Sequence, residues 1–328
     1  MKKFDIIIFG CGNVGSRHLQ GVLKSKLKSN IYVIENNQES ILVAKQRVKE
    51  IKNLNNKKVF FYKDLNFKKF FFDLAIVATN SHNRVKFVEN IIKHKMITNM
   101  IIEKVAFQNL KDYETALKLI KKNQISCWIN CARNSHGIYN RIKNKIDTTK
   151  KIEMEIKGNG WNLASNTIHF IDLFFYLSNR EGVEFFNKIY KKNKIVKSKR
   201  NLYHEIKGVI KLFNNLGDKI VLEDDNKNNK DLIIKIRNSK NLFEINESKN
   251  TFQLTQTINK KKSVDRIKFK TLLQSNLSSL YVTRLSDKKA LKLPTINNSY
   301  FSHKILLDVL KKQFEYSFKK KITKCLVS

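Results

Sequence analysis

The feature that most constrains this chain is a glycine-rich turn directly after a short apolar segment. Ile6–Phe9 predicts a buried strand, and it leads straight into Gly10-Cys11-Gly12-Asn13-Val14-Gly15. The first glycine permits a tight turn, the second lets the backbone approach a pyrophosphate, and the third allows close packing of helix on strand. A helix expected over residues 16–26 would direct its positive end at the phosphates. The pattern predicts a dinucleotide site whose phosphate loop is formed by Gly10, Gly12, Asn13, Val14 and Gly15.

A carboxylate follows at the spacing at which such sites bind ribose. Glu35 comes directly after the next apolar segment, 31–34, twenty residues beyond Gly15. An acid at this position accepts hydrogen bonds from the ribose hydroxyls and repels the 2′-phosphate of NADP. Residues 36–38 contain no arginine that would reverse this preference. NAD is therefore the predicted cofactor, in preference to NADP. A glycine turn without a ligand and an FAD site are the alternatives.

Apolar segments alternate with helical patterns over the first 125 residues. Helix faces are marked by 85–92 and 113–120. Strand–helix alternation of this kind predicts parallel β-α-β units, that is, an α/β doubly wound Rossmann sheet. The expected strands are 4–9, 31–34, 59–62, 74–78 and 100–102, with 126–130 as a further edge strand.

The pattern changes after about residue 150, where strand-like segments follow one another without intervening helices. Consecutive strands of this kind predict an open, mainly antiparallel sheet in a second α/β domain. Helices are expected at 166–177 and at 303–318. The predicted domains are 1–125, which binds NAD, and 126–328, which binds substrate and forms oligomers, with the last helix allowed to pack on the first domain. The expected strands are 151–157, 183–190, 205–213, 219–222, 232–236 and 252–257.

The net charge of +37, from 65 Lys+Arg against 28 Asp+Glu, suggests a nucleic-acid partner at first sight. However, the basic residues are scattered along the chain, and a single proline among abundant Lys, Asn and Ile is typical of AT-rich coding. No basic run alternates with aromatic residues as a base-stacking surface would. We therefore expect no specific nucleic-acid partner, although a basic nucleic-acid binder stays as a rival. The charge also favours an acidic substrate such as a sugar nucleotide.

Four cysteines and the absence of a long apolar run bear on the compartment. No stretch of 18 apolar residues is present, and the N-terminal apolar segment is too short for a secretion signal. Cys127 and Cys131 have no second Cys/His pair at zinc-finger spacing. These features predict a cytoplasmic protein with reduced cysteines, no metal site and no membrane partner.

Four further motifs carry a resemblance to a known family. They are Asp73–Asn80, Ile102–Val105, Asn130–Arg133 and Asn166–Asp172. In order and spacing they resemble the glucose–fructose oxidoreductase and inositol dehydrogenase (Gfo/Idh/MocA) family across most of the chain, while residues after about 180 match only in general pattern. The resemblance implies an NAD(P)-dependent oxidoreductase of a sugar or nucleotide-sugar substrate, a homo-oligomer, and a branch concerned with surface-polysaccharide synthesis.

The resemblance also implies catalytic roles for Lys104, His169 and Asp172. Lys104 ends a predicted parallel strand at the carboxyl edge, where such sheets bind ligands. Beside a positively charged nicotinamide its pKa would fall, which suits proton transfer with a hydroxyl. His169 and Asp172 are three residues apart and share a helix face, so the carboxylate would fix the imidazole tautomer. Without the resemblance, a surface lysine and a helix-surface pair are the simpler interpretations.

Contacts to cofactor and substrate follow from the same motifs. Thr79, Asn80 and Glu103 are expected beside the cofactor. Asn130, Arg133, Trp161 and Ser165 are expected beside the substrate, with structural roles at the domain junction as the alternative for Asn130, Arg133 and Trp161.

Two positions depart from the family pattern. Val105 stands where the family has the proline of Glu-Lys-Pro, and Ser165 stands where it usually has an aspartate. The second departure removes one member of the usual acid–base pair. It keeps open the alternative of a redox-silent NAD-binding sensor or scaffold.

Overall fold

The chain divides into two compact units, and each unit combines several separate segments of the sequence. The computed structural model describes residues 3–54, 57–188, 191–200, 202–224 and 231–328. The first unit comprises Met1–Phe107, Lys111–Ala132 and Leu272–Asn297. The second comprises Gln108–Leu110, Arg133–Thr271 and Asn298–Ser328. This division differs from the predicted boundary between residues 125 and 126.

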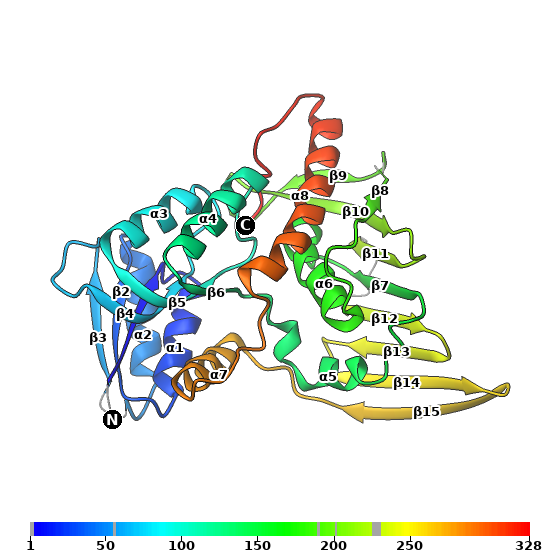
Figure 1. Ribbon diagram of the computed structural model, residues 1–328, viewed down its shortest axis with the longest axis horizontal. Helices are drawn as coiled ribbons and strands as arrows, with labels where there is room; N and C mark the ends of the chain where they lie inside the picture. Colours follow the sequence, from blue (N-terminus) through cyan, green and yellow to red (C-terminus); the bar gives the residue numbers. More distant parts are fainter. Residues whose placement is uncertain (1–2, 55–56, 189–190, 201, 225–230) are drawn as a thin grey trace. The chain divides into compact units, whose positions relative to one another are not determined.

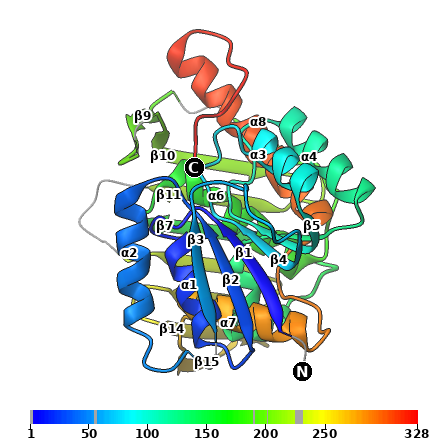
Figure 2. The ribbon, with the colours of Figure 1, turned by 90° about the vertical axis from the view of Figure 1, so that its left-hand side faces the viewer.

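The first unit is built on a parallel sheet in the order β3-β2-β1-β4-β5-β6 (Figures 1 and 2). This order reverses between β1 and β4, which is the point at which doubly wound sheets bind their ligands. The strands are β1 (Phe4–Phe9), β2 (Ser29–Ile34), β3 (Lys58–Tyr62), β4 (Phe71–Val77), β5 (Met96–Ile102) and β6 (Ser126–Ile129). The helices are α1 (Gly15–Lys24), α2 (Gln38–Lys49), α3 (Arg84–His94), α4 (Leu110–Lys122) and α7 (Gln274–Ser286). The predicted Rossmann sheet is confirmed.

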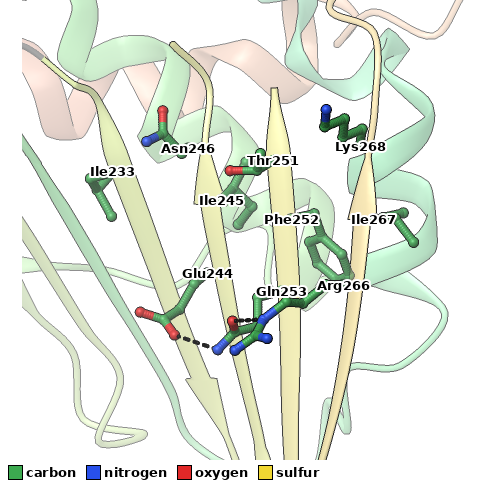
Figure 3. Close-up of a pocket in the computed structure, with 10 residues that line it drawn as sticks. All are labelled: Ile233, Glu244, Ile245, Asn246, Thr251, Phe252, Gln253, Arg266, Ile267 and Lys268. Atoms are coloured by element: carbon green, nitrogen blue, oxygen red, sulfur yellow. Dashed lines mark hydrogen bonds between the residues drawn. The ribbon is translucent and has the colours of Figure 1, made fainter. Parts of the chain in front are cut away.

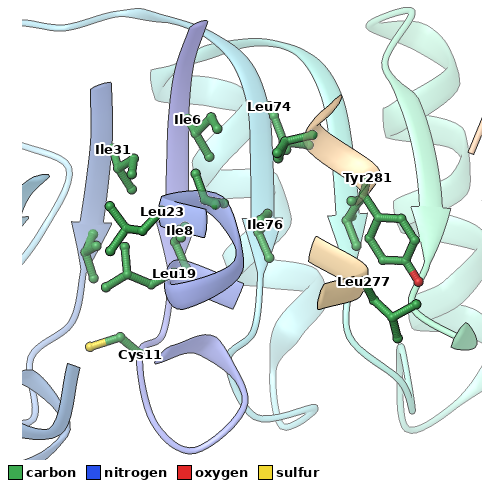
Figure 4. Close-up of a cluster of buried hydrophobic side chains, with 14 of the residues drawn as sticks. Ile6, Ile8, Cys11, Leu19, Leu23, Ile31, Leu74, Ile76, Leu277 and Tyr281 are labelled. Atoms are coloured by element: carbon green, nitrogen blue, oxygen red, sulfur yellow. The ribbon is translucent and has the colours of Figure 1, made fainter. Parts of the chain in front are cut away.

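Helix α7 joins this unit although it lies about 250 residues after α1 in the sequence. Leu277 and Tyr281 of α7 share a buried cluster with Leu19 and Leu23 of α1 (Figure 4). The two helices approach so closely that a Cβ on Gly21 would lie 2.3 Å from the Ser275 carbonyl oxygen. Burial of this apolar face explains why residues 272–297 leave the predicted second domain.

Two further observations account for the changed boundary. Strand β6 pairs with β5 as the edge of the first sheet, and Ile129 N–H donates to the Pro294 carbonyl at 3.0 Å. The sequence allowed the last helix of the chain to pack on the first unit. In the structure α7 belongs to the first unit, whereas α8 (Ile296–Phe318) belongs to the second unit from Asn298 onward.

The second unit contains a sheet of nine strands in the order β15-β14-β13-β12-β7-β11-β10-β8, with β9 paired to β10 (Figure 1). All pairs are antiparallel except β7 with β11. The strands are β7 (Ile152–Gly158), β8 (Phe186–Asn187), β9 (Lys194–Lys197), β10 (His204–Phe213), β11 (Lys219–Asp224), β12 (Ile233–Asn238), β13 (Asn241–Asn246), β14 (Thr251–Ile258) and β15 (Lys261–Lys268). With α8, the helical segments are a 3₁₀ turn (Ala132–Ser135), α5 (Gly137–Lys143) and α6 (Leu163–Ser178). The predicted open, mainly antiparallel sheet is confirmed.

The sheet of the second unit buries one face. Alternate residues of its central strands, such as Ile234 and Ile236 of β12 and Phe243 and Ile245 of β13, are completely buried. The intervening positions are charged or polar, as in the Lys235–Glu244 ion pair of 2.9 Å. This period-two pattern is what a half-covered antiparallel sheet requires.

The predicted segment 183–190 contributes only the short strand β8, and its last two residues lie outside the described ranges. Within those ranges, no helix has the length and apolar character that a membrane crossing requires. All four cysteines are buried thiols.

Candidate functional site

Each glycine of the Gly10–Gly15 loop is required for a different reason. Gly10 has φ +80°, and a Cβ there would lie 3.0 Å from the Ala78 carbonyl oxygen. A Cβ on Gly15 would lie 1.9 Å from the Gly10 carbonyl oxygen, so helix and strand come into direct backbone contact. A Cβ on Gly12 would meet only Ser40 Oγ, at 3.9 Å. Gly12 therefore borders open space, as the backbone approach of a pyrophosphate requires.

The N-terminus of α1 is electrostatically suited to an anion. Val14 precedes the helix without a side-chain cap, and the first turn contains no acidic residue. Arg47, from α2, donates through Nη1 to the Asn13 carbonyl oxygen at 3.0 Å and contacts Ser16 Oγ. The helix dipole and this guanidinium both favour negative charge at the loop. The sequence motif did not indicate Arg47, because it lies 32 residues beyond Gly15 on a separate helix.

Glu35 is held at the edge of a cavity of about 470 Å³ that the glycine loop borders. Its carboxylate accepts hydrogen bonds from the backbone N–H of Cys11 at 2.8 Å and of Asn37 at 2.9 Å. The position of the acid is thus fixed by the loop itself. Lys63, at the end of β3, also lines this cavity and was not anticipated.

Thr79 and Asn80 follow β4 and line the same cavity. The Thr79 hydroxyl oxygen is buried and has no hydrogen-bond partner among the described residues. A buried hydroxyl that lines a cavity is suited to a polar ligand atom. Open space at Gly12, a fixed carboxylate at Glu35 and this hydroxyl together fit the groups of a nicotinamide dinucleotide.

Glu103 and Asn130 take part in a buried network of the first unit, and their roles beside cofactor and substrate stay predictions. His18 Nε2 lies 2.8 Å from Glu103 Oε1, and Asn130 Nδ2 donates to the same oxygen at 2.5 Å. Ser278 Oγ, from α7, lies 2.8 Å from His18 Nδ1. Burial raises the pKa of the Glu103 carboxyl, but the interaction with His18 and the hydrogen bond from Asn130 outweigh it, so the pKa is lowered.

The Ser278–His18–Glu103 chain has the connectivity of a hydrolase triad but no exposed nucleophile. His18 is completely buried and Ser278 is 1% exposed. A carboxylate only accepts hydrogen bonds, so His18 Nε2 carries the proton toward Glu103. We interpret the chain as a structural link between α1, β5 and α7.

Lys104 lies two residues after the end of β5 and is half-buried. It lies at the carboxyl end of the parallel sheet, as predicted. The following residues, Val105 and Ala106, are completely buried, and the Lys104–Val105 peptide bond is cis. The loop that carries Lys104 is therefore embedded in the first unit, while Lys104 itself stays partly accessible.

Comparison with solved structures covers nearly the whole chain, whereas no protein-family model and no curated protein sequence matches it. A super-repressor mutant of Gal80p from Saccharomyces cerevisiae superposes with a TM-score of 0.73 at 14% identity, over 96% of this chain and 97% of that one. UDP-N-acetylglucosamine 3-dehydrogenase GnnA from Acidithiobacillus ferrooxidans gives 0.70 at 11% identity, over 94% and 97%. An oxidoreductase from Agrobacterium radiobacter in complex with NAD⁺, L-tartaric acid and magnesium gives 0.70 at 10% identity, over 95% and 96%. The chain shares its fold with these structures, and this is the two-domain fold that the sequence resemblance implies.

His169 and Asp172 lie on α6 of the second unit, and the Asp172 carboxyl has a hydrogen-bond partner from another segment. The Asp172 carboxyl is buried and accepts a hydrogen bond from Asn134 Nδ2 at 3.1 Å. Burial raises its pKa to about 8, although the hydrogen bond from Asn134 acts in the opposite direction. A pKa near 8 favours the protonated acid at neutral pH, and the pairing of Asp172 with His169 stays a prediction.

Ser165 is buried in the first turn of α6, beside a carboxylate that comes from another element. Glu205 Oε2, on β10, accepts hydrogen bonds from the N–H groups of Ala164 at 2.8 Å and of Ser165 at 3.2 Å. Asn162, which precedes the helix, provides no side-chain cap. Glu205 therefore caps α6 and places negative charge at the helix N-terminus, where it is stabilising.

Arg133 and Trp161, both predicted beside the substrate, meet at the ring of Phe170 on α6. The Arg133 guanidinium lies 4.1 Å above this ring, and Trp161 packs edge-on against it with centroids 5.3 Å apart. Arg133 also forms a two-bond ion pair with Glu247, at 3.0 and 2.7 Å. These contacts are compatible with a structural role within the second unit, and a role beside the substrate stays a prediction.

A second cavity, of about 530 Å³, lies on strands β12 to β15 of the second unit (Figure 3). Its polar wall is a chain in which Arg266 donates to Gln253 at 2.7 Å and Gln253 donates to Glu244 at 3.3 Å. None of the predicted site residues lines it. The cavity at the glycine loop is therefore the candidate cofactor site.

Proposed function

We propose that this protein binds NAD at the Gly10–Gly15 loop and acts as an oxidoreductase of a sugar or nucleotide-sugar substrate. The observation that carries the proposal is the pairing of open space at Gly12 with the Glu35 carboxylate, which Cys11 and Asn37 hold at the cavity edge. Among the structures that share this fold, one is a UDP-N-acetylglucosamine dehydrogenase and one contains NAD⁺.

Isothermal calorimetry is expected to show that the protein binds NAD more tightly than NADP. Replacing Glu35 by alanine removes both the ribose acceptor and the charge that repels a 2′-phosphate. Glu35→Ala should therefore shift the ratio of NAD to NADP affinity at least tenfold toward NADP, about 1.4 kcal/mol. Glu39→Ala, on the exposed start of α2, is the matched control and should leave the ratio unchanged. Failure of the wild-type protein to bind either nucleotide would contradict the proposal.

Bound NAD would supply the hydride acceptor or donor, and the chain would handle the proton of the substrate hydroxyl. We assign this task to Lys104 and His169. Lys104 is half-buried at the carboxyl edge of the first sheet, and His169 is half-buried on α6. An ammonium and an imidazole are both able to donate to, or accept from, a hydroxyl near neutral pH when their surroundings adjust the pKa.

Lys104→Met and His169→Phe are each expected to lower kcat about 100-fold or more, the usual contribution of general acid–base catalysis. NAD affinity should stay unchanged, because neither side chain lines the glycine-loop cavity. Nicotinamide fluorescence would follow turnover on UDP-N-acetylglucosamine and a panel of other nucleotide sugars. Lys111→Met serves as the control, because Lys111 is an exposed residue of α4. If a variant of Lys104 or His169 retained the full rate, the catalytic role assigned to that residue would be wrong.

A redox-silent NAD-binding sensor is the second candidate function. Ser165 supplies no acid, and the Asp172 carboxyl is occupied in the interior with Asn134. Gal80p, which shares the fold, is described as a transcriptional regulator. Binding of a nucleotide sugar by calorimetry, together with no change of nicotinamide fluorescence across the same panel, would favour this candidate over the enzyme.

Three finer proposals rest on the family resemblance. We propose that the protein works in the cytoplasm, assembles as a homo-oligomer and takes part in surface-glycan synthesis. The open face of the second sheet supports the assembly, because its charges alternate in sign, as in the 2.9 Å Lys235–Glu244 pair. The +37 charge is scattered rather than gathered with aromatic residues, which favours an acidic small molecule over a nucleic acid.

A further inference from the structure

Arg84 is a buried residue whose guanidinium group contacts backbone carbonyl oxygens. It begins α3 in the first unit and is 2% exposed. Its Nη1 lies 2.6 Å from the Glu103 carbonyl oxygen, 2.7 Å from that of Val105 and 2.8 Å from that of Ala106. Its Nη2 contacts the Thr79 carbonyl oxygen. One guanidinium thus joins two loops that follow neighbouring parallel strands.

The two loops that Arg84 joins are those to which the proposed function assigns separate tasks. The loop after β4 carries Thr79, which lines the cofactor cavity. The loop after β5 carries Lys104, and two of the three carbonyl groups bound there flank this lysine in sequence. Arg84 therefore links the wall of the cofactor cavity to the loop that carries Lys104.

We propose that Arg84 is a positioning residue that holds Lys104 at a fixed place relative to the Thr79 wall of the cofactor cavity. This inference rests on the proposed function only in so far as Lys104 acts on a substrate. A planar guanidinium offers five N–H donors in a fixed fork, which a lysine does not reproduce.

The buried pair of His18 and Glu103 complements Arg84 without replacing it. His18 binds the Glu103 side chain at 2.8 Å, whereas Arg84 binds the carbonyl groups on both sides of Lys104. Loss of the guanidinium would leave three buried carbonyl oxygens of this loop without that donor. Such groups recover partners by a local shift of the backbone. The shift would displace Lys104 while the Glu103 side chain stays anchored.

The test compares the chemical reactivity of Lys104 in wild type, Arg84→Gln and Arg84→Lys. Trace acetylation of the folded protein, read by mass spectrometry, gives the rate at Lys104 relative to all other lysines, so that a global loss of stability is corrected internally. Both variants are expected to change the Lys104 rate severalfold while Lys63 and Lys111 keep theirs. Guanidinium ion, added to Arg84→Ala far below denaturing concentrations, should restore the wild-type rate.

Arg284→Gln is the matched control. Arg284, on α7 of the same unit, also donates to a backbone carbonyl, that of Ala290 at 2.7 Å, but contacts neither loop. It should leave the Lys104 rate unchanged. Equal Lys104 rates in wild type and Arg84→Gln, or an absence of guanidinium rescue, would overturn the proposal.

This outcome is independent of whether the protein is an enzyme, because the labelling needs no substrate. Where the nucleotide-sugar panel gives turnover, Arg84→Gln should lower kcat about 100-fold with little change in KM, as expected for a displaced catalytic group. If the wild-type protein turned over none of the nucleotide sugars, the proposed enzymatic function would be contradicted. The Lys104 labelling rates would still decide whether Arg84 positions Lys104.

Discussion

His18→Leu is expected to lower the free energy of unfolding of the first unit by about 3 kcal/mol, because it removes a hydrogen-bond donor from the buried Glu103 carboxylate. Glu103 is 8% exposed, and His18 is completely buried at 2.8 Å from its carboxylate. Leucine fills much of the imidazole volume but offers no N–H, so the carboxylate loses its main donor. A buried charge without a partner costs far more than a lost neutral hydrogen bond.

Urea denaturation followed by tryptophan fluorescence would measure this effect. The chain has two tryptophans, Trp128 on β6 in the first unit and Trp161 in the second. A Trp161→Phe background therefore reports on the first unit alone, which avoids treating two units as one transition. His94→Leu, on the exposed last turn of α3, is the control and should cost less than 1 kcal/mol.

Two further variants separate charge from packing. Ser278→Ala removes only the hydroxyl beside His18 Nδ1 and should cost about 1 kcal/mol. Glu103→Met combined with His18→Leu removes the orphaned charge, so the double variant should be more stable than His18→Leu alone. A His18→Leu variant as stable as the His94 control would show that the pair contributes no net stability.

The glycine loop and the parallel sheet were predictable because their signals are local. The three glycines and Glu35 lie within 26 residues, and strands β1 to β5 are short apolar segments between helical patterns. Physical chemistry restricts such a turn to few conformations, so the sequence alone indicated the end of the sheet at which we propose that a cofactor binds. Strand β15 gave no such signal, since seven of its eight residues are exposed and the alternation that marks a half-buried strand is absent.

Contacts between distant segments were not predictable from the same patterns. Ser278 and His18 are 260 residues apart, and nothing near either residue indicates the other. The same holds for Glu205 and Ser165, separated by 40 residues, and for Arg133 and Glu247, separated by 114. Buried polar groups find partners wherever the fold brings them together. For this reason the residue types of the site were indicated by sequence, while several of their partners were not.

The stability of the second unit is expected to fall as pH rises from about 4 to 8 because of Asp172. Burial raises the pKa of this carboxyl from 3.8 to about 8 in the folded chain. Below pH 4 the Asp172 carboxyl is protonated in both the folded and the unfolded chain, so titration of Asp172 costs the folded state no stability there. Between these values only the unfolded chain releases the proton. The folded state then loses about 1.4 kcal/mol per pH unit relative to the unfolded state, several kcal/mol in all.

Asp172→Asn removes the titration while preserving the shape of the neutral acid. Asn134 Nδ2 donates to Asp172 at 3.1 Å, whereas Asn134 Oδ1 is buried without a partner among the described residues. A protonated acid or an amide at position 172 has a donor for that oxygen, which an ionised carboxylate lacks. The variant should match wild type near pH 4 and become progressively more stable than wild type toward pH 8.

Urea denaturation at several pH values, read from Trp161 in a Trp128→Phe background, would test this expectation. Asp308→Asn, which breaks an exposed pair with Lys312 on α8, should change stability by well under 1 kcal/mol. Parallel curves for wild type and Asp172→Asn would show that Asp172 is ionised when folded. Diverging curves would place a neutral acid three residues from His169 and exclude Asp172 as its charged partner. The proton chemistry of the second unit would then rest on His169, with Glu205 as the buried carboxylate at the start of the same helix.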